Sequence, residues 1–221
     1  FPIQLYYAKN SQAIQNDQIE AELENNPSLL MINPVDRLGS YSIIRTMKEK
    51  NIPVIFFNRE PLAEDLGLWD KVYYVGAKAA QSGQLQARLV MELFGSNSNN
   101  LNELDKNNDG KIQLIILKGE QGHQDAETRT SEVLKSFQEN NFAIDLLAIE
   151  VANWNFNEAA VKTQKLLQKF QHEVELFISN NDDMALGAIQ TMRELGFLSD
   201  TNNDGHVNKY DHLWIPVVGI D

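Results

Sequence analysis

The chain of 221 residues contains no cysteine, and this absence removes several classes of protein from consideration. Without thiols there is no disulfide scaffold, no thiol nucleophile and no cysteine-ligated zinc site. Basic residues are also scarce, since 19 Lys and Arg face 31 Asp and Glu and leave a net charge of −12. An acidic chain without a basic cluster argues against binding to nucleic acid or to an anionic membrane surface.

Long apolar runs and common catalytic motifs are missing as well. No run of about 18 apolar residues is present, so the sequence predicts no membrane-spanning helix. The patterns G-x-S-x-G, H-E-x-x-H and the P-loop are absent. No pair of acidic residues stands out as an acid–base pair for hydrolysis. We therefore expect a protein that binds its ligand and is not an enzyme.

Apolar segments of strand length alternate along the chain with amphipathic segments that have the 3.6-residue period of helices. Strands are expected at 4–8, 29–33, 54–58, 72–76, 112–119, 145–152, 175–180 and 215–220. Helices are expected at 15–25, 41–51, 82–94, 126–140, 157–170 and 183–197. Most of the strands are continuously apolar, which suits strands buried on both faces. The alternation predicts an α/β fold with parallel sheets flanked by helices.

The pattern also suggests two lobes, with a boundary near Gly76–Ala77, where it passes through a strand and restarts with a helix. We expect residues 1–76 to form a partial N-terminal lobe and 77–221 a partial C-terminal lobe. The chain opens FPIQLYYA with neither an initiator Met nor a signal peptide, which favours a processed or trimmed chain. It ends WIPVVGID as a strand ends, with no crossover helix after it.

The stretch DKNNDGKIQ (105–113) has the spacing of a calcium-binding loop. Calcium takes about 6–8 oxygen ligands, and a conserved glycine at the sixth position of such loops allows a sharp turn, as Gly110 does here. The expected ligands are Asp105, Asn107, Asp109, the Lys111 carbonyl and Gln113, with Glu175 as a candidate for the missing strong acid. The alternative is an Asn/Asp-rich surface turn without a metal.

A second stretch, DTNNDGHVNKYD (200–211), repeats this spacing and carries its own terminal acid. The ligands expected for a possible second calcium are Asp200, Asn202, Asp204, the His206 carbonyl, Asn208 and Asp211. Aspartate is one methylene shorter than glutamate, which makes bidentate closure by the last residue harder. The alternative is again a polar insertion loop.

Polar and aromatic side chains follow the carboxyl ends of the expected strands, where open α/β sheets bind their ligands. These candidates are Asn58, His123, Asp125, Arg129, Trp154, Asn181 and Asp221. Amides, a carboxylate–guanidinium set and an indole face are suited to a sugar, because hydroxyls hydrogen-bond to the polar groups and the C–H face of a pyranose packs on an aromatic ring.

Each candidate also has an ordinary structural explanation. Asp125 could be a helix N-cap, and its pair with Arg129 could be an exposed ion pair of little energetic value. Trp154 could belong to the core, and His123 could be an ordinary loop residue. The convergence of five strand ends is the stronger argument for a binding site.

These segments together resemble the bacterial galactose/glucose-binding proteins, the soluble receptors of sugar ABC importers. The resemblance runs through most of the chain and is carried by QNDQI, IPVIFFNREP, DKVYYVG, DKNNDGKIQ, LKGEQGHQDAETRT, VELFISNNDDMALGAIQTM and IPVVGID. It implies a two-lobed periplasmic-binding-protein type I fold that closes around D-glucose or D-galactose. Asn58 would then bind from the first lobe, His123, Asp125, Arg129, Asn181 and Asp221 from the second, and Trp154 would stack on the ring. The family also carries one calcium held by a nine-residue loop and a distant glutamate, which assigns the last ligand to Glu175.

The chain departs from the family pattern in three respects. The family's first strand and helix and everything after Asp221 are absent, and the loop 200–211 looks like an insertion. The resemblance implies a monomeric protein that is periplasmic or extracellular, and lipid anchoring of the full-length protein is a further part of this expectation. Its expected partners are a membrane ABC permease and a chemoreceptor. The alternatives are a sensory or regulatory sugar-binding domain of the same fold and a calcium-regulated interaction protein.

Overall fold

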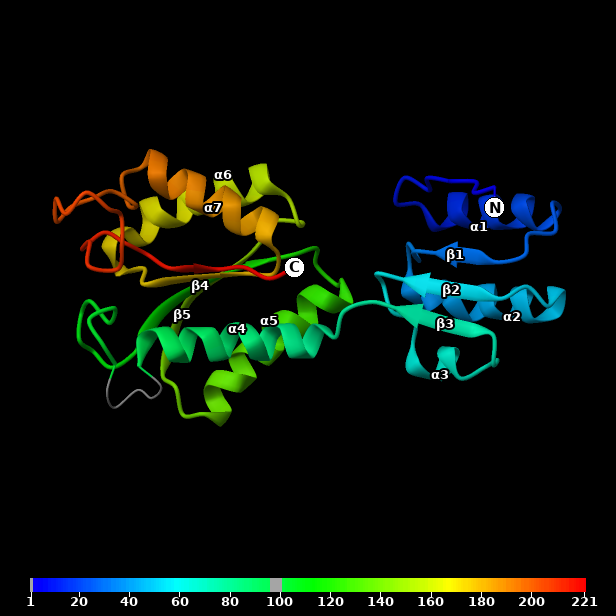
Figure 1. Cartoon of the computed structure of the whole chain (residues 1–221), viewed down its shortest axis with the longest axis horizontal. Coiled ribbons are helices and arrows are strands. Elements are labelled where there is room, and N and C mark those ends of the chain that lie inside the picture. The colour runs from blue at the N-terminus through cyan, green and yellow to red at the C-terminus, as the bar shows by residue number, and fades with distance from the viewer. Residues whose placement is uncertain (1, 96–100) are drawn as a thin grey trace. The chain divides into compact units, whose positions relative to one another are not determined.

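The computed structural model describes residues 2–95 and 101–221, and the chain divides into two compact units, Phe1–Ala77 and Lys78–Asp221 (Figure 1). Each unit contains parallel strands joined by helices, which confirms the α/β fold predicted from the alternating pattern. That the units are partial lobes of a two-lobed protein stays a prediction.

The first unit contains a parallel sheet with the strand order β1-β2-β3. Its elements are α1 (Gln12–Leu23), β1 (Leu30–Ile32), the 3-10 helix η1 (Arg37–Gly39), α2 (Ser40–Lys50), β2 (Val54–Phe57), the short α3 (Ala63–Leu66) and β3 (Val72–Val75). The short helices were not predicted from the sequence, because four residues are too few for a helical period to be visible.

The strand predicted at 4–8 is wrong, since residues 2–8 form no strand. An extended segment becomes a strand only when its backbone N–H and C=O groups form hydrogen bonds with a neighbouring strand. Here the segment bonds to α1 instead. The Tyr6 hydroxyl donates to Glu22, and the Gln18 amide donates to the Tyr7 carbonyl oxygen at 3.1 Å.

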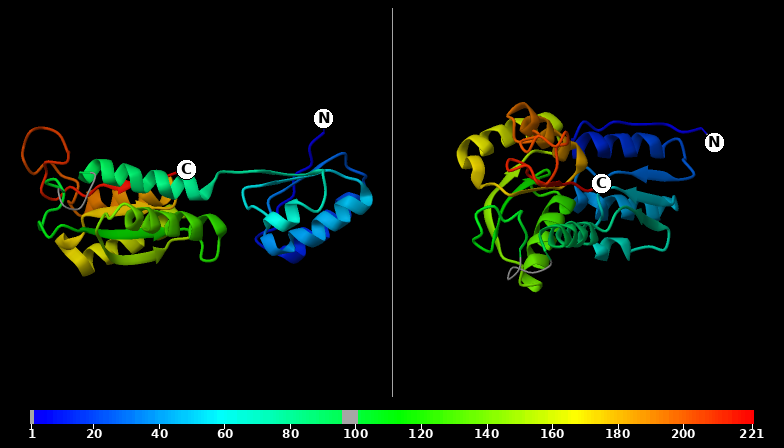
Figure 2. Two further views of the ribbon diagram at one scale, coloured as in Figure 1. Left: turned by 90° about the horizontal axis from the view of Figure 1, so that it is seen from below. Right: turned by 60° about the vertical axis from the view of Figure 1, so that its left-hand side comes forward.

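The core of the first unit lies on one face of its sheet. Ile32, Val54 and Phe56 point to this face and pack against Leu23 of α1 and several side chains of α2. Figure 2 (left) shows both helices on the same side of the strands. The opposite face carries exposed apolar side chains, namely Met31, Phe57, Tyr73 and Val75.

The second unit contains a parallel sheet with the strand order β5-β4-β6-β7. Its elements are α4 (Ala79–Phe94), β4 (Ile112–Lys118), α5 (Gln124–Glu139), β5 (Ile144–Val151), α6 (Phe156–Phe170), the 3-10 helix η3 (Gln171–Glu173), β6 (Leu176–Ser179), α7 (Asp182–Glu194) and β7 (Val217–Val218). The predicted last strand, 215–220, is shortened to two residues, both paired with β6.

Helices cover both faces of the second sheet (Figure 1). Ile112, Leu114 and Ile116 of β4 pack against α4 and α5, whereas Ile115 and Leu117 pack against α6 and α7. Every residue of β4 is buried, as the continuous apolar run predicted for a central parallel strand. Among the described helices, none is long and apolar enough to cross a membrane.

Candidate functional site

The carboxyl edge of the second sheet gathers several helix starts as well as strand ends. Helix α5 begins after His123, α6 after Asn155 and α7 after Asn181, and each of these residues caps its helix with a side-chain acceptor. Since parallel strands all end at the same edge, these caps lie near one another. The edge therefore combines polar side chains with the positive ends of helices.

Trp154 lies over the end of β4 at this edge. Its backbone has a φ of 62°, a left-handed conformation that turns the chain sharply after β5. A Cβ atom on Gly119 would lie 2.3 Å from the indole, so only glycine lets the ring approach β4 this closely. The His123 ring meets the indole edge-on with the two ring centroids 5.1 Å apart, and the Arg129 guanidinium carbon lies 5.9 Å from the indole centroid.

Asp125 and Arg129 form a largely buried pair beside the indole. The Arg129 Nη2 atom lies 3.9 Å from the Asp125 Oδ2 atom, and the two side chains are 9% and 13% exposed. The explanation of an exposed ion pair is therefore wrong. The N-cap explanation for Asp125 is also wrong, because His123 caps α5 by accepting from the Asp125 N–H at 3.2 Å. The buried Arg129 Nε has no hydrogen-bond partner within the described chain.

Asn181 joins the same group from the end of β6. Its Oδ1 accepts from the Met184 N–H at 3.0 Å, and its Nδ2 donates to the Trp154 carbonyl oxygen at 3.4 Å. The second unit thus brings His123, Asp125, Arg129, Trp154 and Asn181 together, as expected from the sequence. Whether they bind a sugar stays a prediction.

The other two predicted sugar ligands lie at strand ends outside this group. Asp221 is exposed, three residues beyond β7. Asn58 belongs to the first unit, where it follows β2 with a φ of 63° and accepts a hydrogen bond at its carbonyl oxygen from the Tyr74 hydroxyl at 3.0 Å. The participation of Asn58 and Asp221 in one site stays a prediction.

Asn180 was not among the predicted sugar ligands, although it lies directly beneath them. The side chain is fully buried, and its Oδ1 accepts from the Gly119 N–H at 3.0 Å and from the Thr130 hydroxyl at 3.3 Å. Its carbonyl oxygen accepts from Arg129 Nη1 at 2.5 Å. The sequence signal that could have found it is an amide in the last buried position of an otherwise apolar strand.

The loop 105–113 is folded by hydrogen bonds from its own backbone to its acidic side chains. Asp105 accepts from the Asp109 N–H at 3.3 Å and from the Gly110 N–H at 3.0 Å. Asp109 in turn accepts from the Lys111 N–H at 2.8 Å. These bonds turn several oxygens of the loop toward its inside, and each carboxylate oxygen keeps a further lone pair for a cation.

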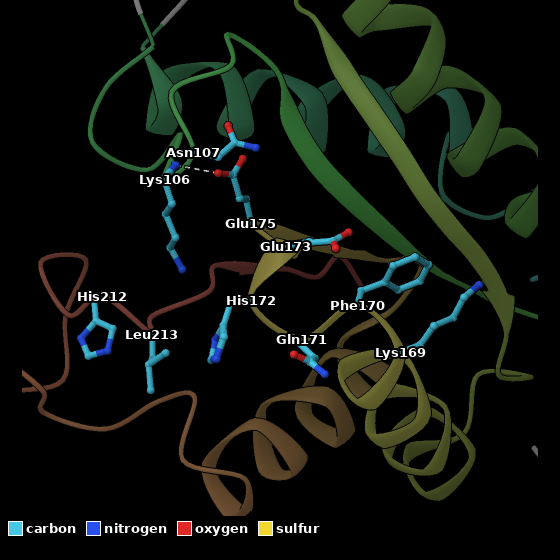
Figure 3. Close-up of a pocket in the computed structure, with 10 residues that line it drawn as sticks. All are labelled: Lys106, Asn107, Lys169, Phe170, Gln171, His172, Glu173, Glu175, His212 and Leu213. Atoms are coloured by element: carbon cyan, nitrogen blue, oxygen red, sulfur yellow. Dashed lines mark hydrogen bonds between the residues drawn. The ribbon is translucent and has the colours of Figure 1, made fainter.

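Glu175 closes this loop from the sheet. It accepts from the Lys106 N–H at 2.6 Å and from the Gln113 N–H at 3.3 Å, although the two partners lie far away in sequence. Figure 3 shows its carboxylate directed at the loop. Burial is the main cause that raises the pKa of Glu175 to about 7, and nearby Asp105 adds to the rise.

The residues of this loop fit a calcium ion by their donor chemistry. Gln113 is buried, and its Oε1 has no hydrogen-bond partner within the described chain. An unpaired buried oxygen is costly, and a cation inside the loop would satisfy it. In residues 2–95 and 101–221 no three His, Asp or Glu side chains are clustered as a metal site, so amide and carbonyl oxygens would have to complete the shell.

The loop 200–211 repeats the hydrogen bonds of the first loop position by position. Asp200 accepts from the Asp204 N–H at 3.1 Å and from the Gly205 N–H at 2.9 Å. Asp211, at the twelfth position, accepts at 2.6 Å from the N–H of Thr201, the second residue of its loop. In the first loop, Glu175 likewise accepts from the N–H of the second residue, Lys106. Its second oxygen accepts from the Asn208 N–H at 2.8 Å.

A cavity of about 700 Å³ lies beside the first loop at the amino-terminal side of the strands (Figure 3). It is lined by Lys106, Glu175, His172 and His212, among others. Because it lies away from the strands' carboxyl ends, it is separate from the candidate sugar site within the second unit.

Parallel strands covered by helices, with polar residues gathered at the carboxyl ends of the strands, are typical of α/β proteins that bind small ligands. The chain matches the family described as "Periplasmic binding protein domain" over residues 2–207, and it belongs to that family. It is 38% identical over 190 residues to the D-galactose/methyl-galactoside binding periplasmic protein of Haemophilus influenzae, covering 86% of this chain and 56% of that protein. It is 27% identical to a putative rhizopine-binding protein of Rhizobium meliloti, covering 95% of this chain and 63% of that protein.

Solved structures agree with this assignment. An ABC transporter solute binding protein from Bacillus halodurans with bound myo-inositol has a TM-score of 0.74 at 25% identity, covering 97% of this chain and 63% of that one. A periplasmic solute binding protein from Actinobacillus succinogenes with bound D-allose has a TM-score of 0.72 at 23% identity, covering 88% and 63%. The type I fold expected from the resemblance is confirmed. The chain spans 56% and 63% of the length of the two curated relatives named above.

Proposed function

We propose that this chain binds a monosaccharide, D-glucose or D-galactose, as part of the soluble receptor of a sugar ABC importer. The observation that carries the proposal is the convergence of His123, Asp125, Arg129, Trp154 and Asn181 at one edge of one sheet. The 38% identity to a galactoside-binding protein favours these hexoses over the ligands bound by the more distant structures. The role is recognition of the sugar without chemical change.

The chemistry of these groups suits a pyranose. The largely buried Asp125 carboxylate accepts from sugar hydroxyls, and Arg129 donates to a hydroxyl or ring oxygen while holding Asp125 in place. Trp154 offers an apolar face to the sugar C–H groups. Asn58 and Asp221 complete the site in this proposal, one from the first unit and one from the end of β7.

The proposed mechanism is a change in population between two arrangements of the lobes. Sugar binds the closed arrangement more tightly and so increases its population, and a membrane permease recognises that form. We place the protein in the periplasm as a monomer, with lipid anchoring and a chemoreceptor partner as further parts of the hypothesis. A sensory or regulatory sugar-binding domain of the same fold is the alternative, and it would bind the same sugars without stimulating a permease.

We propose further that calcium binds the loop 105–113, with Asp105, Asn107, Asp109, the Lys111 carbonyl, Gln113 and Glu175 as ligands. The orphaned Gln113 oxygen and the buried Glu175 carboxylate support this site. The bound ion would neutralise three acids and tie the loop to β6. A second calcium in the loop 200–211 is proposed on the hydrogen-bond pattern that the two loops share.

Isothermal titration of the native polypeptide containing residues 1–221 tests the sugar site. D-galactose, D-glucose, D-allose and myo-inositol form the ligand panel. Asp125→Asn should weaken binding roughly 10- to 100-fold, because a charged hydrogen-bond acceptor becomes neutral. Asp145→Asn is the matched control, since Asp145 is exposed at the other end of the sheet. Equal affinities of the two variants would remove Asp125 from the site, and no binding to any of the four ligands would refute the proposed function.

A further inference from the structure

Gln86 of α4 occupies a position that the amphipathic pattern of its helix does not explain. The side chain is completely buried, whereas Leu85 and Leu89 of the same helix are 38% and 50% exposed. An amphipathic helix normally presents its leucines to the core and its glutamines to solvent. A side-chain amide buried among the core-facing residues of a helix lowers the stability of the fold unless it forms hydrogen bonds there.

The amide of Gln86 bridges the carboxyl ends of two strands. Its Nε2 donates to the Ser179 carbonyl oxygen at 2.7 Å and to the Val218 carbonyl oxygen at 3.2 Å. The reverse orientation of the amide would set its oxygen against two carbonyl oxygens, so these partners fix the assignment. Ser179 is the last residue of β6 and Val218 the last of β7, where the pairing of the two strands ends.

The helix is held where Gln86 can reach both strands. A Cβ atom on Gly83 would lie 2.5 Å from the Arg129 carbonyl oxygen, so the glycine allows α4 to approach α5 closely. Gln86 lies one turn further along the same buried stripe. A Cβ atom on Gly219 would lie 2.2 Å from the Asp182 side chain, so the end of β7 runs directly against the start of α7.

Both strand ends that Gln86 holds lead into predicted sugar ligands. Asn181 follows Ser179 by two residues, and the Ser179 hydroxyl donates to the Asn181 carbonyl oxygen at 2.8 Å. Asp221 follows Val218 by three residues. We infer that Gln86 is a positioning residue of the sugar site, which sets the spacing between Asn181 and Asp221 by fixing the ends of β6 and β7. This inference rests on the proposed sugar site.

Gln86→Met tests the inference, because methionine has a similar size and no donor. Hydrogen exchange should become faster at residues 180–184 and 218–221, where the two carbonyl anchors are lost. The side-chain amide resonances of Asn181 should shift, and the affinity for the sugar should fall about tenfold. Gln81→Met, an exposed position of the same helix, is the control and should change none of these readouts.

The outcomes separate a positioning role from a merely structural one. If Gln86→Met lowers the melting temperature but leaves the Asn181 resonances and the sugar affinity of the folded protein unchanged, the inference is overturned. If the unmodified polypeptide binds no sugar of the panel, the proposed function fails, while the exchange rates and resonances still decide whether Gln86 positions the strand ends.

If the Gln86→Met variant does not fold, a measurement on the unmodified protein still tests whether Gln86 bridges the two strands. Scalar couplings across the hydrogen bonds from Gln86 Nε2 to the carbonyl carbons of Ser179 and Val218 should be detectable by NMR. Detection of both couplings supports the bridge, and the absence of both overturns it.

Discussion

The loops 105–113 and 200–211 have the same internal hydrogen bonds but take their closing acids from different places. Glu175 reaches the first loop from the start of β6, whereas Asp211 closes the second loop from within the same twelve residues. The first loop is therefore tied to the central sheet, and the second loop is closed upon itself. An ion in the first loop would connect distant parts of the chain, while an ion in the second would order only a local segment.

The two closing acids also differ in their electrostatic surroundings. Burial raises the pKa of Glu175 to about 7. Hydrogen bonds from backbone N–H groups, of which that of Asn208 has the largest effect, lower the pKa of Asp211. Three backbone N–H groups and the Thr201 hydroxyl thus offset the desolvation of Asp211, whereas the backbone N–H groups that reach Glu175 do not offset its burial. We therefore expect the proposed ion to matter more for the first loop than for the second.

The largest effect is expected for Glu175→Gln, which keeps the side-chain shape and removes the charge. If calcium is present at about 1,000 times its dissociation constant, its loss from one site costs about 4 kcal/mol of unfolding free energy. For a chain of this size that corresponds to a decrease in melting temperature of roughly 10 °C. Differential scanning calorimetry with calcium and with a chelator measures the effect.

Glu173→Gln is the matched control for this experiment, since Glu173 is exposed and lies two residues earlier. It should leave both the melting temperature and the calcium content unchanged. A melting temperature that does not respond to the chelator in the unmodified protein would contradict a structural calcium in the first loop.

Gln113→Met gives a smaller effect whose sign depends on the metal. With calcium bound, loss of the Gln113 Oε1 ligand should lower the calcium affinity about tenfold, or about 1.4 kcal/mol. With a chelator present, removal of the buried unpaired Oε1 should offset or exceed the loss of the hydrogen bond that Gln113 Nε2 donates to Asp109 Oδ2 at 2.9 Å, so stability should stay equal or increase. Calcium titration and thermal melts in both conditions check the reversal, with the exposed Gln138→Met as control. Destabilisation of equal size in both conditions would show that Gln113 acts only in packing.

The central strand and the main helices of the second unit could be predicted well because they are long and strongly patterned, whereas the two-residue β7 could not. The continuous apolar run of β4 is buried at every position, and the predicted helices 126–140 and 157–170 lie within two residues of their observed bounds. The segment 4–8 could not be assigned in the same way. Its apolar residues favour a strand, but a strand forms only when another strand lies beside it and pairs with its backbone.

The site shows the same limit of prediction from local sequence. His123, Asp125 and Asn181 could be named because strand ends in an α/β fold are places where polar residues bind ligands. The roles of Asn180 and Gln86 could not be predicted, since they depend on which distant carbonyl and amide groups the fold brings to them. A buried amide in a helix or strand pattern is visible in the sequence, but its partners are not.

Asp211→Asn isolates the second loop and should have a smaller thermal effect than Glu175→Gln. The calcium content should fall from two ions to one per chain, and the melting temperature should decrease by roughly 2–4 °C, because only a local segment loses its order. Metal analysis by mass spectrometry measures the first result, with Asp145→Asn as control. An unmodified protein that binds one calcium would mean that the loop 200–211 is an insertion without a metal.

Asp211→Glu is expected to give the smallest effect and to sharpen the comparison between the two closing acids. A glutamate at the twelfth position can reach the ion with both oxygens, as Glu175 would in the first loop. We therefore expect a gain in calcium affinity of roughly three- to tenfold at the second loop, with a change in melting temperature of less than about 2 °C. Competitive calcium titration of Asp211→Glu combined with Glu175→Gln measures the calcium affinity of the second loop alone. A weaker affinity would show that the loop is shaped for closure by the shorter acid, whose two oxygens already accept from the backbone on opposite sides of the loop.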